Sequence, residues 1–478
     1  MEKSTALSPV EEVHCGARGV PETVGMAALF TGGPPRADAL RARVVERWGH
    51  LPRLRRVLLP PAPPARLRGH RWLPLDRFDA RRHVTVVNAV VNAAVDTVAD
   101  AADSPGSGDG AAFTALLGRL VTRALPAGLP PWRLTLVRGA GRGRFAVVLT
   151  AHHALLDGRS LETLLSHLFD GTPGRGVRRG TGVRAVGALG AAGPDRPRPP
   201  AAPGAGPGRA LPLPPGLRPR PDLAWTEVDA DAVRAARRAL PGLGATLNEV
   251  LLAAAAGALR TVHGDPDRWP GAPRPLYGSF PVDLRTPQED RMLGTAVSAV
   301  RVPLPVTAAD PAERLAACRG ALAAFGPLRG GADTVRRAVG AAALLGPWAV
   351  RLLASLSCSP GFCPVTCLAF GWPRGPWSLD GRPLERIVPL PPVLAPGTVC
   401  LALTDYAGAY TLTAVTHTLP GGARPLAGAL TRELALLARW PEPAPGAPGG
   451  PARPGPARMS CAGRFAGAIR GTRNGPPR

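Results

Sequence analysis

Two hydrophobic patterns lie next to each other near the middle of the first half of this chain. Residues 145–150 are apolar and partly β-branched, which predicts a buried strand. Residues 161–169 place leucines at helical spacing, and Ser160 just before them is a candidate N-cap. The sequence therefore predicts a strand, a short loop and a helix in immediate succession.

The same two patterns recur in the second half of the chain. Helical spacing of apolar residues predicts helices over 231–240, 247–262, 333–357 and 426–438. Short apolar runs predict strands near 275–283, 296–306, 398–404 and 410–417. Mixed strands and helices of this kind predict an α/β fold.

Composition divides the chain into parts. Residues 171–222 and 441–478 are rich in Gly, Pro and Arg and lack a periodic apolar pattern. We expect a linker in the first segment and a disordered tail in the second. The 478 residues, 45% of them hydrophobic, can bury a large core. The prediction is an N-terminal half over 1–170 and a C-terminal half over 223–440.

The formal net charge of +24 raises the question of nucleic-acid binding. Lys3 is the only lysine, so nearly all of the positive charge is carried by arginine. These arginines are scattered along the chain, and aromatic residues make up only 5% of it, which argues against a nucleic-acid partner. A positive surface would instead suit the phosphates of acyl-CoA or anionic lipid headgroups.

The chain shows no signal-peptide pattern and no uncharged apolar run of the ~18 residues that a membrane span needs. Residues 339–357 come closest, but Pro347 and Arg351 interrupt them. We expect a core helix there, with an amphipathic helix at a lipid surface as the alternative. The seven cysteines are irregularly spaced, which predicts a reduced compartment and no metal site. The expected location is cytoplasmic, with peripheral contact at the inner membrane face as an option.

The loop between the first strand and helix carries the most specific chemical signal. It consists of His152-His153, three intervening residues and then Asp157-Gly158. Chance would produce this arrangement in about one of a thousand chains of this composition. A neutral imidazole on a rigidly held loop can accept the proton of a hydroxyl group during attack on a thioester. His153 is the candidate base, His152 a candidate supporting residue, and Gly158 a residue that lets the chain turn into the helix without a Cβ clash.

This loop resembles the HHxxxDG signature of CoA- and carrier-dependent acyltransferases. Over residues 7–440 the chain further resembles the bacterial wax ester synthase/diacylglycerol acyltransferase family. The matching segments are Leu7-Ser8-Pro9, Leu51-Pro52-Arg53-Leu54-Arg55, Trp72 with Phe78-Asp79 and His83-Val84, Pro130-Pro131-Trp132, Thr246-Leu247-Asn248-Glu249, and Pro281-Val282-Asp283-Leu284-Arg285 with Leu293-Gly294.

The resemblance implies a fold of two chloramphenicol-acetyltransferase-like halves around a central active-site tunnel. It implies that His153 is the general base and that Asp157 pairs with an arginine to hold the loop, for which Arg285 is a candidate. Asn248 and Glu249 match the family's "ND" helix, with Glu249 in place of the usual aspartate. Thr246-x-x-Glu249 is also a capping box, so helix initiation alone could explain that segment.

One segment departs from the family pattern. The family carries a Ser-Asn-x-x-Gly-Pro element in its C-terminal half, whereas residues 365–373 of this chain lack the Ser-Asn pair. If that asparagine stabilises the oxyanion, its loss costs about 2.7–4 kcal/mol in the transition state. The substrate and the level of activity are therefore more open than the fold.

The function implied by the resemblance is transfer of a long-chain acyl group from acyl-CoA, as co-substrate, to diacylglycerol or a fatty alcohol. No cofactor is expected. A peripheral membrane or lipid-droplet surface is a candidate partner. Two alternatives stay open. One is a condensation-domain-like or polyketide-associated acyltransferase that uses a carrier-bound thioester, and the other is a non-catalytic lipid-binding relative.

Overall fold

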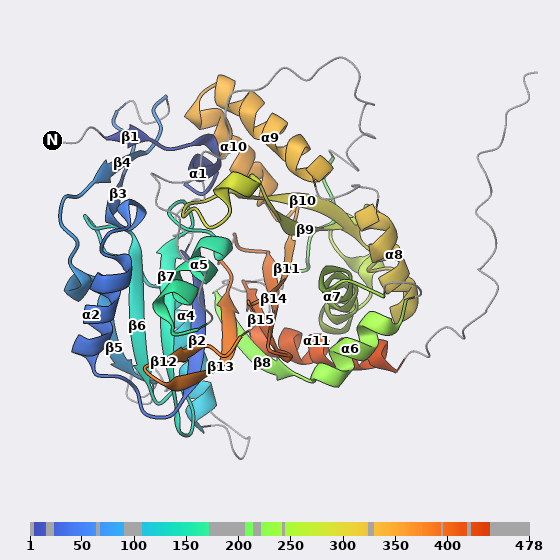
Figure 1. The fold of residues 1–478 in the computed structure, drawn as a ribbon. Helices are drawn as coiled ribbons and strands as arrows, with labels where there is room; N and C mark the ends of the chain where they lie inside the picture. The colour runs from blue at the N-terminus through green and yellow to red at the C-terminus, as the bar shows by residue number, and fades with distance from the viewer. Residues whose placement is uncertain are drawn as a thin grey trace, which may run out of the picture. The chain divides into compact units, whose positions relative to one another are not determined.

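Two six-stranded sheets, each with helices packed beside it, form the framework of the protein (Figure 1). The structure is a computed structural model, and it describes residues 4–15, 23–63, 67–89, 108–171, 206–213, 221–240, 244–323, 329–373, 375–392, 395–417 and 422–439. The predicted tail over 441–478 and most of the predicted linker over 171–222 lie outside these residues. The described residues, which end at Arg439, belong to one compact unit.

The first sheet has the strand order β12-β13-β2-β7-β6-β5. Its centre is the antiparallel pair β2 and β7, in register from Thr23 opposite His152 to Thr31 opposite Arg144. Both strands are buried over almost their whole length because their residues are apolar on both faces. The strand bounds are β2 Thr23–Thr31, β5 Val84–Asn88, β6 Trp132–Arg138, β7 Arg144–His152, β12 Ser378–Leu379 and β13 Arg382–Leu390.

Short helices and a small sheet surround the first six-stranded sheet. The small sheet has the order β1-β4-β3, and its strands are β1 Thr5–Ala6, β3 Arg56–Leu59 and β4 Arg71–Pro74. The helices are α1 Pro9–Val13, α2 Ala37–Trp48, η1 Pro52–Arg55, η2 Ala80–Arg82, α4 Gly108–Thr122 and α5 Gly158–Leu168. Trp132 is fully buried at the start of β6 and donates its indole N–H to the carbonyl of Leu54.

The second sheet has the strand order β10-β9-β11-β14-β15-β8. Strands β11 and β14 run parallel, and all other neighbours except β11 and β9 are antiparallel. The bounds are β8 Asp222–Val228, β9 Leu276–Asp283, β10 Val297–Leu304, β11 Val365–Gly371, β14 Val399–Tyr406 and β15 Ala409–Thr416.

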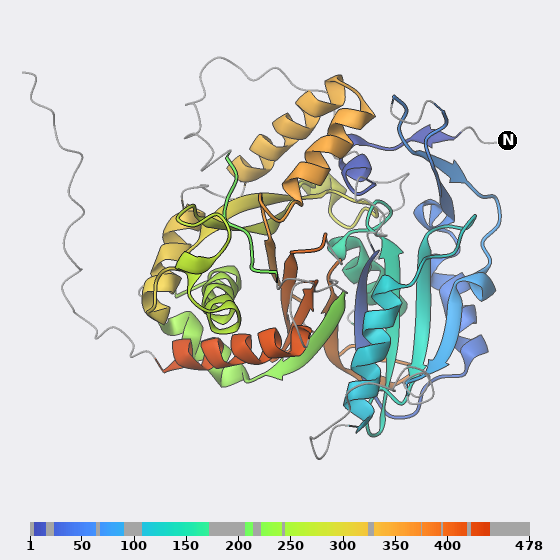
Figure 2. The ribbon, with the colours of Figure 1, turned by 180° about the vertical axis from the view of Figure 1, so that it is seen from behind.

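The helices of the second half include the alanine-rich α7, which is buried from Glu249 to Leu259 and is visible end-on beside the second sheet in Figure 2. The capping box predicted at its start is confirmed, since Thr246 and Glu249 each accept the other's backbone N–H. The bounds are α6 Ala230–Arg238, α7 Leu247–His263, η3 Pro266–Arg268, η4 Pro287–Glu289, α8 Pro311–Ala323, α9 Arg329–Leu344, α10 Pro347–Ser357 and α11 Ala423–Ala438.

The two sheets are joined by an exchange of strands. Strands β12 and β13 come from the second half of the sequence, yet β13 pairs antiparallel with β2 and completes the first sheet. The sheets therefore do not divide the chain where the composition does. Part of the predicted linker also packs against the second half, because the buried Arg209 donates to the carbonyls of Pro266 at 2.6 Å and Arg274 at 2.7 Å.

The prediction of a core helix over 339–357 is wrong in two respects. Gly346 and Pro347 break the segment into α9 and α10, because proline removes a backbone donor and starts the second helix. In addition, Leu344, Leu345 and Trp348 lie at the surface. Within the described residues, no helix combines the length and apolar composition that crossing a bilayer requires.

Candidate active site

The His152–Gly158 loop joins the end of β7 to the start of α5, as predicted. Its N-cap differs from the prediction, however. Asp157, not Ser160, caps α5, and its Oδ1 accepts the backbone N–H of Ser160 at 2.9 Å. Both residues are good N-caps, and the backbone enters the helix three residues earlier than the leucine spacing suggested. The Ser160 hydroxyl is thereby available for contacts outside its own helix.

Asp157 forms a buried ion pair with Arg285, the partner that the sequence suggested for it. Arg285 Nη1 donates to Asp157 Oδ2 at 2.8 Å, and Nη2 donates to Oδ1 at 2.9 Å. The side chain of Asp157 is only 1% exposed and that of Arg285 only 3%. The backbone N–H of Ala296 also donates to Asp157 Oδ2, at 3.0 Å. Four donors thus hold one carboxylate, which fixes the loop that carries both histidines.

The protonation state of this pair follows from competition between burial and charge. Burial by itself would raise the pKa of Asp157, but the Arg285 charge and the hydrogen bonds outweigh it and lower the pKa to about 2. Burial likewise opposes the Arg285 cation, while Asp157 and then Asp283 raise the Arg285 pKa. Asp157 is therefore ionised at neutral pH and acts as a fixed acceptor, which suits a structural role.

Residues 293–296 of the second half dock directly against the loop. The Ser160 hydroxyl donates to the carbonyl of Gly294 at 2.7 Å and accepts the N–H of Gly294 at 3.0 Å. The hydroxyl of Thr295 donates to the backbone carbonyl of His153. The candidate base is therefore held from the second half of the chain as well as from its own strand.

The two histidines occupy different environments. His152 is the last residue of β7, and its Nδ1 accepts the N–H of Ala154 at 3.1 Å, which fits a supporting role. His153 is 9% exposed, and its ring is stacked on His14 with 3.9 Å between centroids and 4° between the ring planes. The contact with His14 was not predicted from the sequence.

A second buried ion pair supports the loop from the N-terminal side. Arg53 of η1 is 2% exposed, pairs with Glu11 of α1, and donates to the carbonyls of Leu155 at 2.9 Å and Ala154 at 2.8 Å. Arg53 and the segment just before Glu11 belong to the motifs that carry the family resemblance. Their contact with the loop could not be inferred, because sequence order does not show which segments meet in space.

The prediction that Gly158 is needed to avoid a Cβ clash at the turn into the helix is wrong. The backbone of Gly158 is not left-handed, and a Cβ added there would meet no atom within 4 Å. The turn into α5 therefore does not require glycine on steric grounds. The start of α5 is therefore uncrowded where a side chain at position 158 would lie.

Asn248 and Glu249 form contacts with elements of the second half and not with this ion-paired loop. Asn248 Oδ1 accepts the N–H of Ala369 in β11 at 3.2 Å, while Glu249 caps α7 and lies 3.5 Å from Arg319. Asn248 thus ties α7 to the strand that lacks the family's Ser-Asn pair. The structural interpretation of both residues is supported by these contacts.

The segment over 365–373 reaches from the second sheet into the first lobe. It forms β11 and the two residues after it, and Trp372 is buried in the hydrophobic core of the first lobe together with Tyr406. Phe370 packs against the same core. The missing Ser-Asn pair therefore falls at a junction between the lobes.

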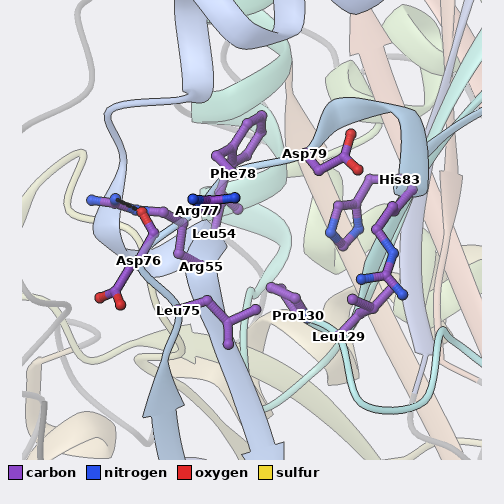
Figure 3. A pocket seen from close by; sticks show the side chains of 11 residues that line it. Leu54, Arg55, Leu75, Asp76, Arg77, Phe78, Asp79, His83, Leu129 and Pro130 are labelled. Carbon is purple, nitrogen blue, oxygen red and sulfur yellow. Dashed lines mark hydrogen bonds between the residues drawn. The ribbon is translucent and has the colours of Figure 1, made fainter. Parts of the chain in front are cut away.

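A separate cavity of about 420 Å³ lies at the edge of the first sheet (Figure 3). Leu54 and Arg55, residues 75–79, Arg82 and His83, and the Leu129-Pro130 turn line it. None of the predicted catalytic residues faces it. Burial lowers the pKa of His83, so this imidazole is neutral at physiological pH. Among the described residues, no group of three or more His, Cys, Asp or Glu side chains is arranged to hold a metal ion.

Comparison with known proteins finds similarity to acyltransferases. Residues 8–192 match the model of the wax ester synthase/diacylglycerol acyltransferase catalytic domain. A Mycobacterium tuberculosis (strain CDC 1551 / Oshkosh) protein, whose name assigns it to the diacylglycerol O-acyltransferases, is 31% identical over 283 residues, which are 52% of this chain and 59% of the relative. A second such protein from strain H37Rv is 29% identical over 240 residues, 42% and 49% of the two chains. The matched region thus spans 59% or less of these relatives.

Solved structures show the same fold. A wax ester synthase/diacylglycerol acyltransferase from Marinobacter aquaeolei VT8 is 18% identical, covers 91% of this chain and 98% of its own, and has a TM-score of 0.57. The first condensation domain of the calcium-dependent antibiotic synthetase is 17% identical, with 92% and 98% coverage and a TM-score of 0.57. The chain therefore has the two-lobed, chloramphenicol-acetyltransferase-like fold of these proteins, and over residues 8–192 it is similar to the wax ester synthase/diacylglycerol acyltransferase catalytic domain.

Proposed function

We propose that the protein is an acyl-CoA-dependent O-acyltransferase that transfers a long-chain acyl group to diacylglycerol or a fatty alcohol. The observation that carries this proposal is the position of His153 on a loop locked by the Asp157–Arg285 pair. An imidazole held from both halves of the chain meets the demand for a preoriented base.

The proposed reaction balances with these two substrates alone. The His153 imidazole accepts the proton of the acceptor hydroxyl while the oxygen attacks the thioester carbonyl. The carbon–sulfur bond then breaks, and the departing thiolate takes the proton from the imidazolium. The products are an ester and free CoA. Asp157 takes no proton in this scheme, since it already accepts four hydrogen bonds.

The substrate class is supported by the family match and by the names of the mycobacterial relatives. The test uses purified full-length protein, labelled palmitoyl-CoA, and either diacylglycerol or hexadecanol, with products separated by thin-layer chromatography. We expect a labelled triacylglycerol or wax ester.

The variant His153→Ala should lower kcat by about 10²–10⁴-fold, the loss typical of a positioned base. His50→Ala is the matched control, because His50 is an exposed imidazole of the same half. Turnover by His153→Ala equal to that of the wild type would rule out the assignment of the base.

A carrier-linked donor is the second candidate, because condensation domains match the fold as well as the Marinobacter enzyme does. Acylation from a carrier-protein thioester but not from palmitoyl-CoA would favour it. The departure at residues 365–373 motivates a third outcome, which is acyl-CoA binding without turnover from either donor.

A further inference from the structure

Large apolar side chains at the surface gather on one helical hairpin. Nine such residues are exposed in the described part of the chain, and five of them lie on α9, α10 and the two-residue turn between them. A sixth is Leu67, whose loop lies against the start of α10: a Cβ added at Gly69 would be 3.1 Å from Pro347. We call these six the apolar patch: Leu67, Leu344, Leu345, Trp348, Leu352 and Leu356.

Helix geometry shows that three residues of the patch form a continuous stripe on α10. Trp348, Leu352 and Leu356 are four residues apart, so they lie on one face of the helix. Val350 and Ala354 on the other side are 1% and 6% exposed. An ordinary surface helix is polar toward water, and a helix that is apolar all round is normally buried. The outer face of α10 therefore has the composition of a covered surface.

The charges around the patch identify what would cover it. No Asp or Glu occurs over residues 334–379. Arg337 is exposed on α9, seven residues before Leu344 and thus on the same helical face, and Arg68 is exposed beside Leu67. Leucine and tryptophan flanked by exposed arginines, with no acidic residue on α10, are complementary to an anionic lipid surface. We propose that the apolar patch binds the surface of an anionic phospholipid bilayer.

The patch is also linked to the candidate base through contacts with α1. Figures 1 and 2 both show α9 and α10 at one end of the molecule, projecting beyond the sheets. Arg351, on the inner face of α10, pairs with Glu12 of α1, and His14 at the end of α1 stacks on His153. Docking of the patch would hold the site at the surface in which a diacylglycerol acceptor resides. This consequence rests on the proposed function, whereas the binding itself does not.

The test measures vesicle binding without any acyl donor. Full-length protein is sedimented with vesicles of phosphatidylcholine alone or of phosphatidylcholine and phosphatidylglycerol at 3:1. We expect stronger binding to the anionic vesicles, weakened by salt. The triple variant Leu345→Ser/Leu352→Ser/Leu356→Ser should bind about tenfold more weakly or worse. Val45→Ser/Leu436→Ser, at similarly exposed positions on α2 and α11, should bind like the wild type.

Several results would overturn the proposal. These are no binding by the wild type, equal binding by the triple variant, or a dimer that the triple variant dissociates, which would identify a second copy as the occupant. Circular dichroism confirms that each variant is folded. Turnover of a water-soluble short-chain alcohol is measured in parallel. Loss of vesicle binding with that turnover retained separates the patch from the catalytic proposal.

The ring contact between His14 and His153 carries a second, independent inference. The imidazole torsion χ2 is broad in the absence of contacts, so a ring used as a base needs a neighbour that fixes its plane. The parallel stack at 3.9 Å provides such a neighbour. His14 is itself held, because the Ser8–Glu11 capping box and the Glu11–Arg53 pair fix α1. We infer that His14 is a positioning residue for His153, an inference that rests on the proposed function.

Two substitutions separate stacking from imidazole chemistry. His14→Phe retains a flat ring, so its kcat should stay within about threefold of the wild type. His14→Ala removes the ring and should lower kcat at least tenfold with little change in KM. His50→Ala is again the matched control. Equal kcat in His14→Ala and the wild type, or equal loss in the Phe and Ala variants, would overturn the inference.

A readout that needs no turnover distinguishes this inference from the proposed function. Carbethoxylation of His153 by diethyl pyrocarbonate is followed by peptide mass spectrometry. Removing the stacked ring exposes His153, so its modification should be faster in His14→Ala than in the wild type and unchanged in His14→Phe. Equal modification rates in all three proteins would contradict the inferred role of His14, whether or not the protein catalyses the proposed acyl transfer.

Discussion

At the scale of single residues, the Asp157–Arg285 pair decides whether the loop keeps its shape. Both side chains are almost fully buried, and removing one partner leaves the other as an unpaired buried charge. We expect Arg285→Ala to lower the free energy of unfolding by about 3–5 kcal/mol. Arg285→Lys should lose less, because the charge remains although the two-pronged contact does not.

The measurement for these variants is urea denaturation at neutral pH. Arg268→Ala serves as the control, since Arg268 is 89% exposed and should contribute less than about 0.5 kcal/mol. A loss for Arg285→Ala no larger than that of the control would contradict the expected role of the pair.

The same carboxylate predicts a pH dependence of stability. The pKa of Asp157 is about 2 when folded, against an ordinary value of 3.8. Its ionised form therefore contributes about 2 kcal/mol at pH values above 4, and this contribution is lost as the pH falls toward 2. Between pH 5 and 2, the wild type should lose about 2 kcal/mol more stability than Asp157→Asn, which cannot titrate. Parallel pH profiles of the two proteins in urea denaturation would refute this.

Individual residues of the candidate site differ in how well the sequence predicts their contacts. The spacing of His152, His153 and Asp157 and the strand-loop-helix context were predictable because they are local. The pairing of Asp157 with Arg285 was one option among more than fifty arginines, and only the family motif singled it out. The stack on His14 was not predictable, because no local pattern marks which side chain will meet a ring 139 positions away.

At the scale of elements, Asn248 shows how one side chain can replace part of a strand pair. Strand β11 pairs with β9 only at Val365 and Thr366, and the N–H of Ala369 further along donates to Asn248. Asn248→Ala would leave this N–H without its acceptor, at a cost of about 1–3 kcal/mol. Asn248→Asp retains an acceptor oxygen and should cost less.

Thermal or urea unfolding of these two variants checks the prediction. Hydrogen exchange of the Ala369 amide is a more local readout, and it should accelerate in Asn248→Ala but much less in Asn248→Asp. Unchanged protection in the alanine variant would show that the bond does not hold β11.

Elements with a clear period were the predictable ones. The helices α6, α7 and α11 and the strands β9, β10, β14 and β15 are confirmed within a few residues of their predicted bounds. The hairpin of α9 and α10 was misjudged because apolar residues on both faces indicate burial, and the sequence cannot show that one face is exposed. The pairing of β13 with β2 was not foreseen for a related reason, since a strand's composition does not name its neighbour.

At the scale of the whole molecule, the exchanged strand makes the two halves interdependent. Strand β13 supplies an edge-to-edge partner for β2 at the centre of the first half. A shared core lies between the sheets, in which α4 and strands of the first sheet pack with β8, β14 and β15. The predicted halves over 1–170 and 223–440 are therefore not expected to behave as separate folding units.

We accordingly expect residues 1–170, produced alone, to fail to fold as a stable monomer. Without β13, the apolar β2 becomes an unpaired edge, and the core between the sheets is exposed, which favours aggregation. Adding residues 375–392 through a flexible linker restores the missing pair and should increase the soluble fraction. The same fusion with Ile387→Asp should not, since Ile387 is 1% exposed in the hydrophobic core of the first lobe. Size-exclusion chromatography and circular dichroism provide the comparison.

A sharp cooperative melt of monomeric residues 1–170 would show that the first half folds by itself even without β13. Failure of the fragment together with rescue by the strand would instead establish that the first sheet is stable only after distant parts of the chain have paired.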